Sequence, residues 1–337
     1  MKTLIVGDTH FANHQAMGGP VVRGVNRRCR ELVETLVRIV RESECQRVIQ
    51  LGDFFDNPRQ PASVVDYVIE SLLPLGVEWH IMAGNHDISS FSAPSAVAPL
   101  RHVRGFHVHE NIEKLDDSYA LVPYTSLGVA ESVKQLPRAD YTLMHYGLSD
   151  GPWSFDYANA HEVRRRSTAH GTQFICGHEH TPQVSAFETV HTLIGAMSDL
   201  NFGDIRTYYR LHGIGHKRLS GSHVEFYIHE YGPEFCAIER AENLRHLLLH
   251  IASADKSLYV RTTPQLEPSV KKLVDVGIFT DYTVQDTEVA APTSEEPECA
   301  VERIDEMLYA HLREKYEPDV AELAVRHLQD VLTKAKL

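Results

Sequence analysis

Apolar runs alternate with segments of helical spacing in the first half of the chain. Each run is apolar or β-branched and ends at a glycine or a polar turn, which predicts buried strands. These strands are Thr3–Gly7, Arg47–Gly52, Glu78–Gly84, Tyr141–Tyr146 and Gln173–Gly177. Between them, apolar residues at helical spacing predict helices at Arg27–Glu42 and Ala62–Leu73. Strands that alternate with helices predict an α/β architecture with a central sheet.

Three later apolar runs have no helices between them, which predicts a second, antiparallel sheet. They are Thr189–Ile194, Arg206–Leu211 and Val224–His229. Together the two sheets predict a four-layer α/β/β/α sandwich over residues 1–232. Residues 233–290 predict a small α+β capping domain, with strands near 235–238, 257–261 and 281–285 and helices near 241–251 and 267–275.

The last segment, residues 291–337, reads as an acidic linker followed by C-terminal helices. Its linker is rich in proline, glutamate and serine. Apolar residues then recur at helical spacing from Val301 onward, and Pro318 breaks or starts a helix. This stripe fits either packing within the tail or a docking surface for a partner coiled coil.

Polar side chains gather where the predicted strands of the first half end. The five strand ends carry Asp8-Thr9-His10, Gly52-Asp53-Phe54-Phe55-Asp56, Gly84-Asn85-His86-Asp87, His145 and Gly177-His178-Glu179-His180. Ligands of open α/β sheets bind outside the carboxyl ends of the strands, so we expect these side chains to share one site. Gathering so many polar groups costs free energy unless a cation compensates, which predicts a metal centre.

The kinds of side chain at these strand ends indicate the metal. Two Asp carboxylates, one Asn amide and four imidazoles, with no thiolate, suit Mn²⁺, Fe²⁺ or Zn²⁺. The set is too rich in nitrogen for Ca²⁺ and untypical of Mg²⁺. Seven side chains are too many for one tetrahedral ion and suit two ions that share a carboxylate. Two-metal sites of this kind hydrolyse phosphate esters.

In their order along the chain, these strand ends resemble the five motifs of the calcineurin-like metallophosphoesterases. The resemblance rests on Asp8-x-His10, Gly52-Asp53-x-x-Asp56, Gly84-Asn85-His86-Asp87, His145 and Gly177-His178-x-His180. It implies a first metal held by Asp8, His10, Asp53 and His180. It implies a second metal held by Asp53, Asn85, His145 and His178, with Asp53 as the bridge.

The same resemblance implies that His86 binds no metal. This imidazole would stabilise the transition state and protonate the leaving oxygen. The neighbouring carboxylate, Asp87, would orient it, as carboxylates orient other catalytic imidazoles. His86 and Asp87 are therefore the expected catalytic pair.

Within that superfamily, the sequence is most similar to the SbcD-type nucleases of DNA repair and recombination. Phe54-Phe55-Asp56 resembles the phage form of the second motif, and the segment from Gly195 to Asp204 resembles the one after the last metal histidines. The resemblance implies a DNA exo/endonuclease that forms a homodimer and works with an SbcC-type ABC ATPase. Mn²⁺ is the expected metal, with Fe²⁺, Zn²⁺ or Mg²⁺ as alternatives. Asp56 stands where cellular SbcD-type enzymes often carry a histidine. The resemblance therefore does not decide whether this chain has a second imidazole that contacts the phosphate.

Two other functions fit the same motifs. A small-molecule phosphomonoesterase or cyclic-nucleotide phosphodiesterase would share the metal ligands but would not need the residues after Gly232. A non-catalytic interaction scaffold would be expected to have lost ligands, and none is missing here. We therefore expect an enzyme that acts on DNA.

The net charge limits how such a chain would hold DNA. The 337 residues carry a formal net charge of −13, which argues against binding by whole-molecule charge alone. The share of residues 1–232 is only −5, and two divalent ions would offset most of it. The chain is therefore expected to rely on a partner. Two groups of arginines, within residues 23–30 and 164–166, fit either DNA contacts or solvated helix faces. The second group lies near Trp153, Phe155 and Tyr157 in the sequence.

The remaining sequence features predict a cytoplasmic protein of a bacterium or a phage-infected cell. No apolar run is long enough for a membrane helix, and the early charges of the N-terminus exclude a secretory signal. The five cysteines lack a C-x-x-C pair and fit reduced thiols. The other histidines, such as His80, His102, His107, His109 and His191, are expected as satisfied strand or surface residues.

Overall fold

The computed structural model describes residues 1–181, 183–184, 191–197, 214–220, 223–229, 234–238, 244, 247, 258–275 and 277–285. They belong to two compact units. The first comprises residues 1–14, 20–200 and 212–232, and the second residues 15–19, 201–211 and 233–337. The predicted strand Arg206–Leu211 and the predicted linker and tail lie outside the described residues.

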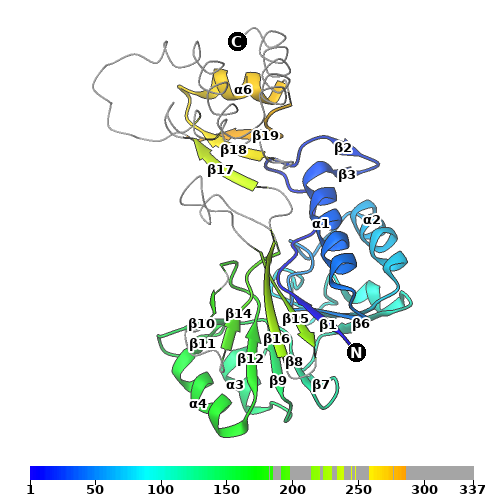
Figure 1. Cartoon of the computed structure of the whole chain (residues 1–337), viewed down its shortest axis with the longest axis vertical. Coiled ribbons are helices and arrows are strands. Elements are labelled where there is room, and N and C mark those ends of the chain that lie inside the picture. Colours follow the sequence, from blue (N-terminus) through cyan, green and yellow to red (C-terminus); the bar gives the residue numbers. More distant parts are fainter. Residues whose placement is uncertain are drawn as a thin grey trace, which may run out of the picture. The chain divides into compact units, whose positions relative to one another are not determined.

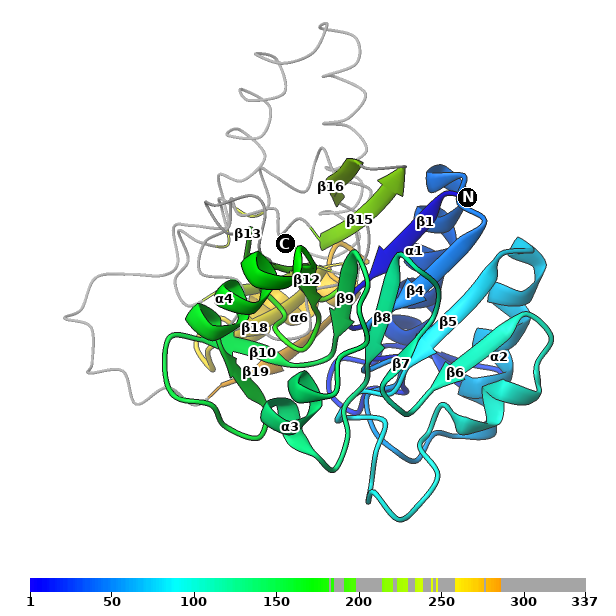
Figure 2. The ribbon, with the colours of Figure 1, turned by 90° about the horizontal axis from the view of Figure 1, so that it is seen from below.

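The first unit, which holds the N-terminus in Figure 1, contains a six-stranded sheet in the order β16-β15-β1-β4-β5-β6, and Figure 2 labels these strands. Its strands are β1 (Thr3–Val6), β4 (Arg47–Gln50), β5 (Glu78–Met82), β6 (Phe106–His109), β15 (Ile214–Ser220) and β16 (His223–His229). The central strands β1, β4, β5 and β6 run parallel, while β15 and β16 form an antiparallel hairpin on β1. The carboxyl ends of the parallel strands therefore meet at one edge.

A second six-stranded sheet of the same unit has the order β13-β14-β12-β9-β8-β7. Its strands are β7 (Glu113–Lys114), β8 (Tyr119–Val122), β9 (Tyr141–Met144), β12 (Gln173–Cys176), β13 (Gln183–Val184) and β14 (His191–Leu193). Strands β8, β9, β12 and β14 run parallel. The α/β class is thus confirmed, but the antiparallel second sheet is wrong.

Strand membership differs from the prediction for a physical reason. β9 and β12 belong to the second sheet, and the run 224–229 joins the first. Along β1, Leu4 and Val6 face one apolar cluster and Ile5 another, and along β9, Leu143 and Met144 divide in the same way. Strands of both sheets are buried on both faces, so their apolar runs do not reveal which sheet each strand joins.

Helices cover the outer face of each sheet, as Figure 2 shows. The helices are α1 (Arg27–Ser43), α2 (Ala62–Leu72), α3 (Gly128–Lys134) and α4 (Ala160–His170), with 3-10 turns η1 (Leu73–Leu75) and η2 (Ala98–His102). α1 and α2 pack on the first sheet, and α3 and α4 on the second. Between the sheets lies a third apolar cluster that contains residues from both, such as Ile49 and Leu143. The first unit therefore has four layers.

The bounds of the predicted helices follow from local chemistry. α1 begins after Asn26, whose side-chain oxygen accepts a hydrogen bond from the Cys29 amide. It ends before Glu44, whose backbone has a left-handed conformation.

Two short strand pairs complete the unit: β2 (Val21–Val22) with β3 (Val25–Asn26), and β10 (Gly147–Ser149) with β11 (Tyr157–Asn159).

The second unit contains a parallel sheet of three strands with one described helix. They are β17 (Glu234–Ile238), β18 (Leu258–Thr262), β19 (Asp281–Val284) and α6 (Glu267–Asp275). Val270 and Leu273 of α6 pack on Cys236 and Val260 of the sheet. The three strands and α6 lie where the sequence predicted them, while the expected helix near 241–251 falls mainly outside the described residues.

Within the described parts of the chain, no helix has the length and apolar character needed to cross a bilayer.

Candidate metal centre

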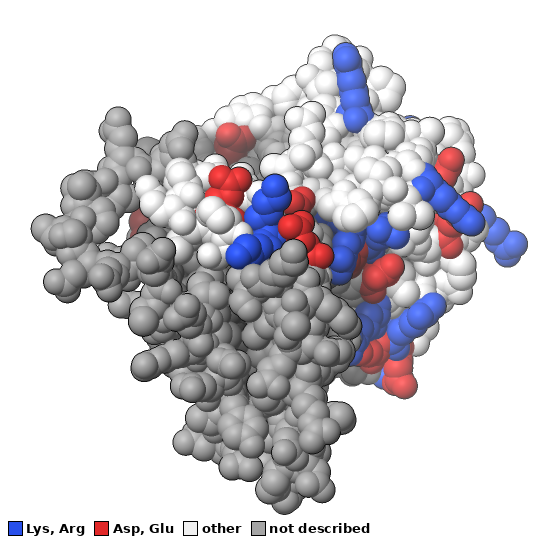
Figure 3. All heavy atoms as spheres, turned by 90° about the horizontal axis from the view of Figure 1, so that it is seen from above, with Lys and Arg blue, Asp and Glu red and all other residues white. Residues whose placement is uncertain are grey.

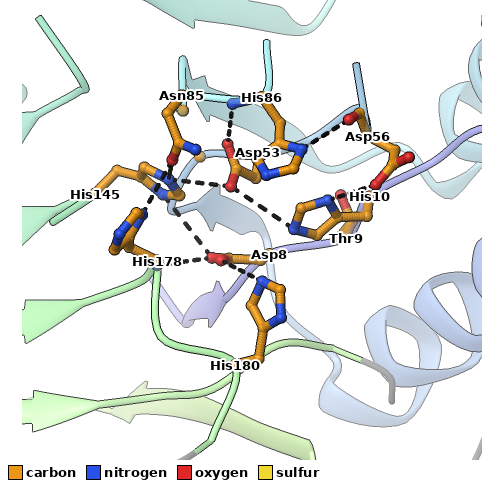
Figure 4. A network of polar contacts seen from close by, with 12 residues as sticks. Asp8, Thr9, His10, Asp53, Asp56, Asn85, His86, His145, His178 and His180 are labelled. Carbon is orange, nitrogen blue, oxygen red and sulfur yellow. Dashed lines mark hydrogen bonds and ion pairs between the residues drawn. The ribbon is translucent and has the colours of Figure 1, made fainter. Parts of the chain in front are cut away.

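The loops that follow five strands bring all seven predicted ligands to one place (Figure 4). β1 leads to Asp8 and His10, β4 to Asp53 and β5 to Asn85 in the first sheet. β9 leads to His145, and β12 leads to His178 and His180 in the second. The site therefore lies at the carboxyl ends of parallel strands from both sheets.

Three of these residues have left-handed backbone conformations. The φ angles are 46° at His10, 51° at Asp53 and 72° at His178. Such angles are uncommon for residues other than glycine and persist where the surrounding structure enforces them. Here the carbonyl of Asp53 accepts hydrogen bonds from the amides of both Thr9 and His10, each at 3.0 Å, which locks the first two loops together.

Two glycines allow the loops to approach so closely. A Cβ atom at Gly52, where φ is +98°, would lie 2.3 Å from Nδ1 of His145. A Cβ atom at Gly84 would lie 2.1 Å from the amide nitrogen of Asp53. Any side chain at these positions would displace a ligand, so the glycines belong to the construction of the site.

Asp8, His10 and His180 form one group of ligand atoms. Oδ2 of Asp8 lies 3.7 Å from Nε2 of His180. Oδ2 of Asp8 and Nε2 of His10 are buried and have no hydrogen-bond partner. Leaving buried polar atoms unpaired costs free energy, so this group is suited to a cation.

Asp53, His145 and His178 form a second group, to which Asn85 adds its amide. The Asn85 Oδ1 atom lies 2.9 Å from Nε2 of His145 and 3.0 Å from Nδ1 of His178. Nδ1 of His145 lies 2.6 Å from the carbonyl oxygen of Leu51 and donates its proton there. Nε2 of His145 is therefore the atom left to hold a metal.

Asp53 lies between the two groups. Its Oδ2 atom is 3.3 Å from Nε2 of His145 and 3.7 Å from Nε2 of His10. Its Oδ1 atom accepts a hydrogen bond from the His86 amide at 2.8 Å. One carboxylate thus faces ligands of both groups, the position that a bridging ligand requires.

Burial and mutual charges shift the titration of the two central carboxylates in opposite directions. Burial raises the pKa of Asp8 to about 6, although His145 partly opposes the shift. Burial alone would also raise the pKa of Asp53, but His145, His10 and His86 outweigh it and hold this pKa below its usual value. Asp53 therefore stays ionised, as a bridging ligand must.

The imidazoles respond to the same surroundings. Burial lowers the pKa of His178 to about 4, helped by His145, and that of His180 to about 4, helped by His10. For His145, burial acts downward, but Asp53 and Asp8 raise the pKa to about 9. The buried carboxylates attract positive charge, and Oδ2 of Asp8 and Nε2 of His10 are buried without a hydrogen-bond partner. The residues present therefore fit two divalent cations.

His86 is oriented by a different group from the one predicted. Its Nδ1 donates to the main-chain carbonyl of Asp56 at 2.7 Å. The buried Asp87 carboxylate instead accepts hydrogen bonds from the amides of Gly84, Phe54 and Phe55, at 2.9 to 3.2 Å. The prediction that the Asp87 carboxylate orients His86 is therefore wrong. It turns toward the core and ties the second and third loops together.

Asp56, which the sequence placed in the second motif without assigning it a role, supports two site residues. Its carboxylate oxygen Oδ1 lies 3.0 Å from Nδ1 of His10, and its carbonyl holds His86. The Nδ1 proton of His10 is therefore directed to Asp56, which leaves Nε2 of that ring facing Asp53. These contacts join residues 46 and 30 positions apart, so no local pattern in the sequence revealed the role of Asp56.

Residues 1–183 match the family model of the calcineurin-like phosphoesterases. The chain belongs to this family. In a calcineurin-like phosphoesterase, two Asp/His groups of this kind indicate a dimetal site and a metal-dependent phosphoesterase.

Three solved structures are similar to this calcineurin-like phosphoesterase. An archaeal phosphodiesterase has 13% identity and a TM-score of 0.36, over 68% of this chain and 99% of that one. A dimetal phosphatase from Danio rerio has 17% identity and a TM-score of 0.44, over 68% of this chain and 95% of that one. The calcineurin-like phosphoesterase YfkN from Bacillus subtilis has 14% identity and a TM-score of 0.36, over 68% of this chain and 88% of that one. No curated protein matches the chain.

The two arginine groups of this phosphoesterase are partly paired with acids. Arg165 and Arg166 both bond to Glu162, and Arg27 bonds to Glu31. On the described part of the face in Figure 3, Lys and Arg lie beside Asp and Glu and form no continuous basic band. This pairing favours solvated helix faces for Arg27, Arg165 and Arg166.

Replacing Asp56 tests how the phosphoesterase holds its first group of ligands. Asp56→Ala is expected to weaken Mn²⁺ binding by roughly 10- to 100-fold, because His10 loses the carboxylate that fixes its Nδ1 proton. The contact to His86 is made by the main chain and is retained. Titration of the metal-free protein with Mn²⁺ measures the affinity.

The matched control is Asp66→Ala, which removes an exposed carboxylate of α2. It should leave the affinity unchanged. Equal Mn²⁺ affinity in Asp56→Ala and the unmodified chain would contradict the assigned role of Asp56.

Proposed function

We propose that this calcineurin-like phosphoesterase hydrolyses phosphodiester bonds in DNA, as the nuclease subunit of an SbcC–SbcD-like complex. The observation that carries the phosphodiesterase activity is Asp53, whose Oδ2 faces His10 of one ligand group and His145 of the other. The complete set of seven ligands argues against a scaffold that has lost catalysis.

The chain's own residues supply positioning and proton transfer. Asp8, His10, Asp53 and His180 would hold one ion, and Asp53, Asn85, His145 and His178 the other. When bound, two such ions polarise a phosphoryl oxygen and lower the pKa of water. The exposed ring of His86 packs edge-on against His10, with ring centroids 4.7 Å apart. Its Nδ1 is occupied by Asp56, so Nε2 is free to protonate the leaving oxygen.

An aromatic platform beside the loop that carries Asn85 is evidence for a nucleotide substrate. Phe91, Tyr124 and Phe155 form this platform, with ring centroids 5.7 to 6.2 Å apart. Phe91 and Phe155 are 50% and 44% exposed as whole residues, which is unusual for residues with rings of this size. The Tyr124 amide bonds to the carbonyl of Ala83, just before Asn85. Exposed rings next to a phosphoesterase site are suited to stack bases.

The choice of DNA among nucleotide substrates rests on the resemblance at Phe54-Phe55-Asp56 and Gly195–Asp204. The mixed charges on the described part of the face in Figure 3 offer little grip on a phosphate backbone. This supports an ABC-type ATPase as the DNA-holding partner. The same resemblance carries the proposal of a homodimer that works in the cytoplasm. Mn²⁺ is the proposed metal.

A substrate comparison with the purified full chain tests this function. The chain should cleave DNA with Mn²⁺ and only poorly with Mg²⁺. Its activity should rise when the ATPase partner is added. DNA, a cyclic nucleotide and a phosphomonoester are supplied at equal concentration. Hydrolysis of the nucleotides with none of DNA would favour the small-molecule enzyme.

The platform gives this comparison a matched pair of variants. Phe91→Ala should raise the KM for DNA by roughly 5- to 100-fold, which corresponds to the loss of one stacked base. A small chromogenic phosphodiester should be hydrolysed as before. Leu73→Ala removes an equally exposed apolar side chain outside the platform and should change neither activity.

The role of His86 is tested by separating metal binding from catalysis. His86→Ala should retain both metal ions and lose hydrolysis by roughly 10²- to 10⁴-fold, because its role is proton delivery. Metal content is measured on the same preparation as the rate. A variant that lost metal along with activity would instead place His86 among the ligands.

A further inference from the structure

A second group of histidine and glutamate side chains lies on the first sheet, along β5 and β6. Glu78 and His80 belong to β5, and His107 and His109 to β6, where His80 is directly opposite His107. Side chains alternate between the faces of a strand. Trp79 and the other intervening residues point into the helix-covered apolar cluster, so the four polar residues share the opposite face.

The geometry of this group suits a metal ion. Oε2 of Glu78 lies 3.6 Å from Nε2 of His80, and Oε1 lies 3.4 Å from Nε2 of His107. One ligand atom from each of these three residues lies within 4.8 Å of the other two. A small adjustment of the exposed side chains would bring all three atoms around a single ion.

A hydrogen-bonded chain behind His80 aims its free nitrogen at the same point. Nδ1 of His109 lies 2.6 Å from the Glu113 carboxylate and donates to it. Nε2 of His109 therefore accepts, and it lies 2.9 Å from Nδ1 of His80, which donates. The remaining nitrogen, Nε2 of His80, carries the lone pair. It is buried, on a side chain only 4% exposed, and has no hydrogen-bond partner.

We propose that Glu78, His80 and His107 form a further metal site that binds Zn²⁺, separate from the dimetal centre. Two imidazoles and one carboxylate provide three protein ligands, and water completes the tetrahedral set that Zn²⁺ prefers. His109 and Glu113 form the supporting chain that metal-bound imidazoles characteristically have.

The charges around the site allow this occupancy. Burial, reinforced by His109, lowers the pKa of His80 to about 4, which keeps the ring in its metal-binding neutral form. Arg47 bonds to Oε2 of Glu78 at 3.3 Å, but it is also held by Asp116 at 2.6 Å. Asp116 can therefore retain the guanidinium when Glu78 turns to the ion. The side chains of Glu78 and His107 are 40% and 49% exposed, so ion and water can enter.

The location assigns a structural role to the site. β6 is the edge strand of the first sheet, and the ion would fasten it to β5. Through His109, the supporting chain reaches Glu113 of β7, the edge strand of the second sheet. Zn²⁺ would therefore stabilise the edges of both sheets, since an ion that binds only the folded state stabilises it.

Titration of the metal-free full chain with Zn²⁺ tests the proposal. Calorimetry and metal analysis should count one more bound Zn²⁺ per chain in the unmodified protein than in His107→Ala. His102→Ala, which removes an exposed histidine outside the group, should keep the unmodified count. Zn²⁺ should also raise the Tm less in His107→Ala than in the control.

Glu78→Gln provides a second variant with the same expectation, and circular dichroism confirms folding of each. Both substituted side chains are partly solvent-exposed, so the fold should tolerate either change. A defect of the dimetal centre would lower every count equally and leave the difference of one intact. Equal Zn²⁺ counts in the unmodified chain, His107→Ala and Glu78→Gln would overturn the proposal.

Discussion

The interaction on which the site depends is the convergence of four loops on Asp53. Its carbonyl holds the amides of Thr9 and His10, its Oδ1 holds the amide of His86, and its Oδ2 faces His10 and His145. Gly52 and Gly84 make room for this convergence, because a Cβ at either position would collide with a neighbouring loop. Both sheets are thereby joined at the edge where their parallel strands end, and the ligands follow from that junction.

Around this junction, carboxylates act as supports as well as ligands. Asp87 is buried among three main-chain amides, where burial, followed by the charge of Asp53, raises its pKa to about 7. Asp56 directs the Nδ1 protons of His10 and His86 with its side chain and its carbonyl. The same principle recurs on β5 and β6, where Glu113 and His109 direct the proton of His80. In each case the acceptor determines which imidazole nitrogen is left for a metal or a substrate.

The sequence predicted the α/β class, the five strands to within two residues and α1 to within one, because apolar spacing acts locally. It also identified the seven residues that the structure brings together, since they follow directly on strands. It did not predict that β9 and β12 form a second parallel sheet, because both sheets bury both faces. The roles of Asp56 and Asp87 depend on contacts about thirty or more residues apart, and no local pattern carries them. The cluster on β5 and β6 was hidden for the same reason, because it joins residues of two strands, such as His80 and His109, that are 29 positions apart.

Electron paramagnetic resonance of the chain loaded with two equivalents of Mn²⁺ tests the central claim most directly. If Asp53 bridges two ions, their spins interact, and the spectrum should show a coupled pair that disappears in Asp53→Asn. The substitution preserves the size of the side chain and removes the charge that both ions would share. A spectrum of isolated Mn²⁺ ions in the folded, unmodified chain would contradict the account.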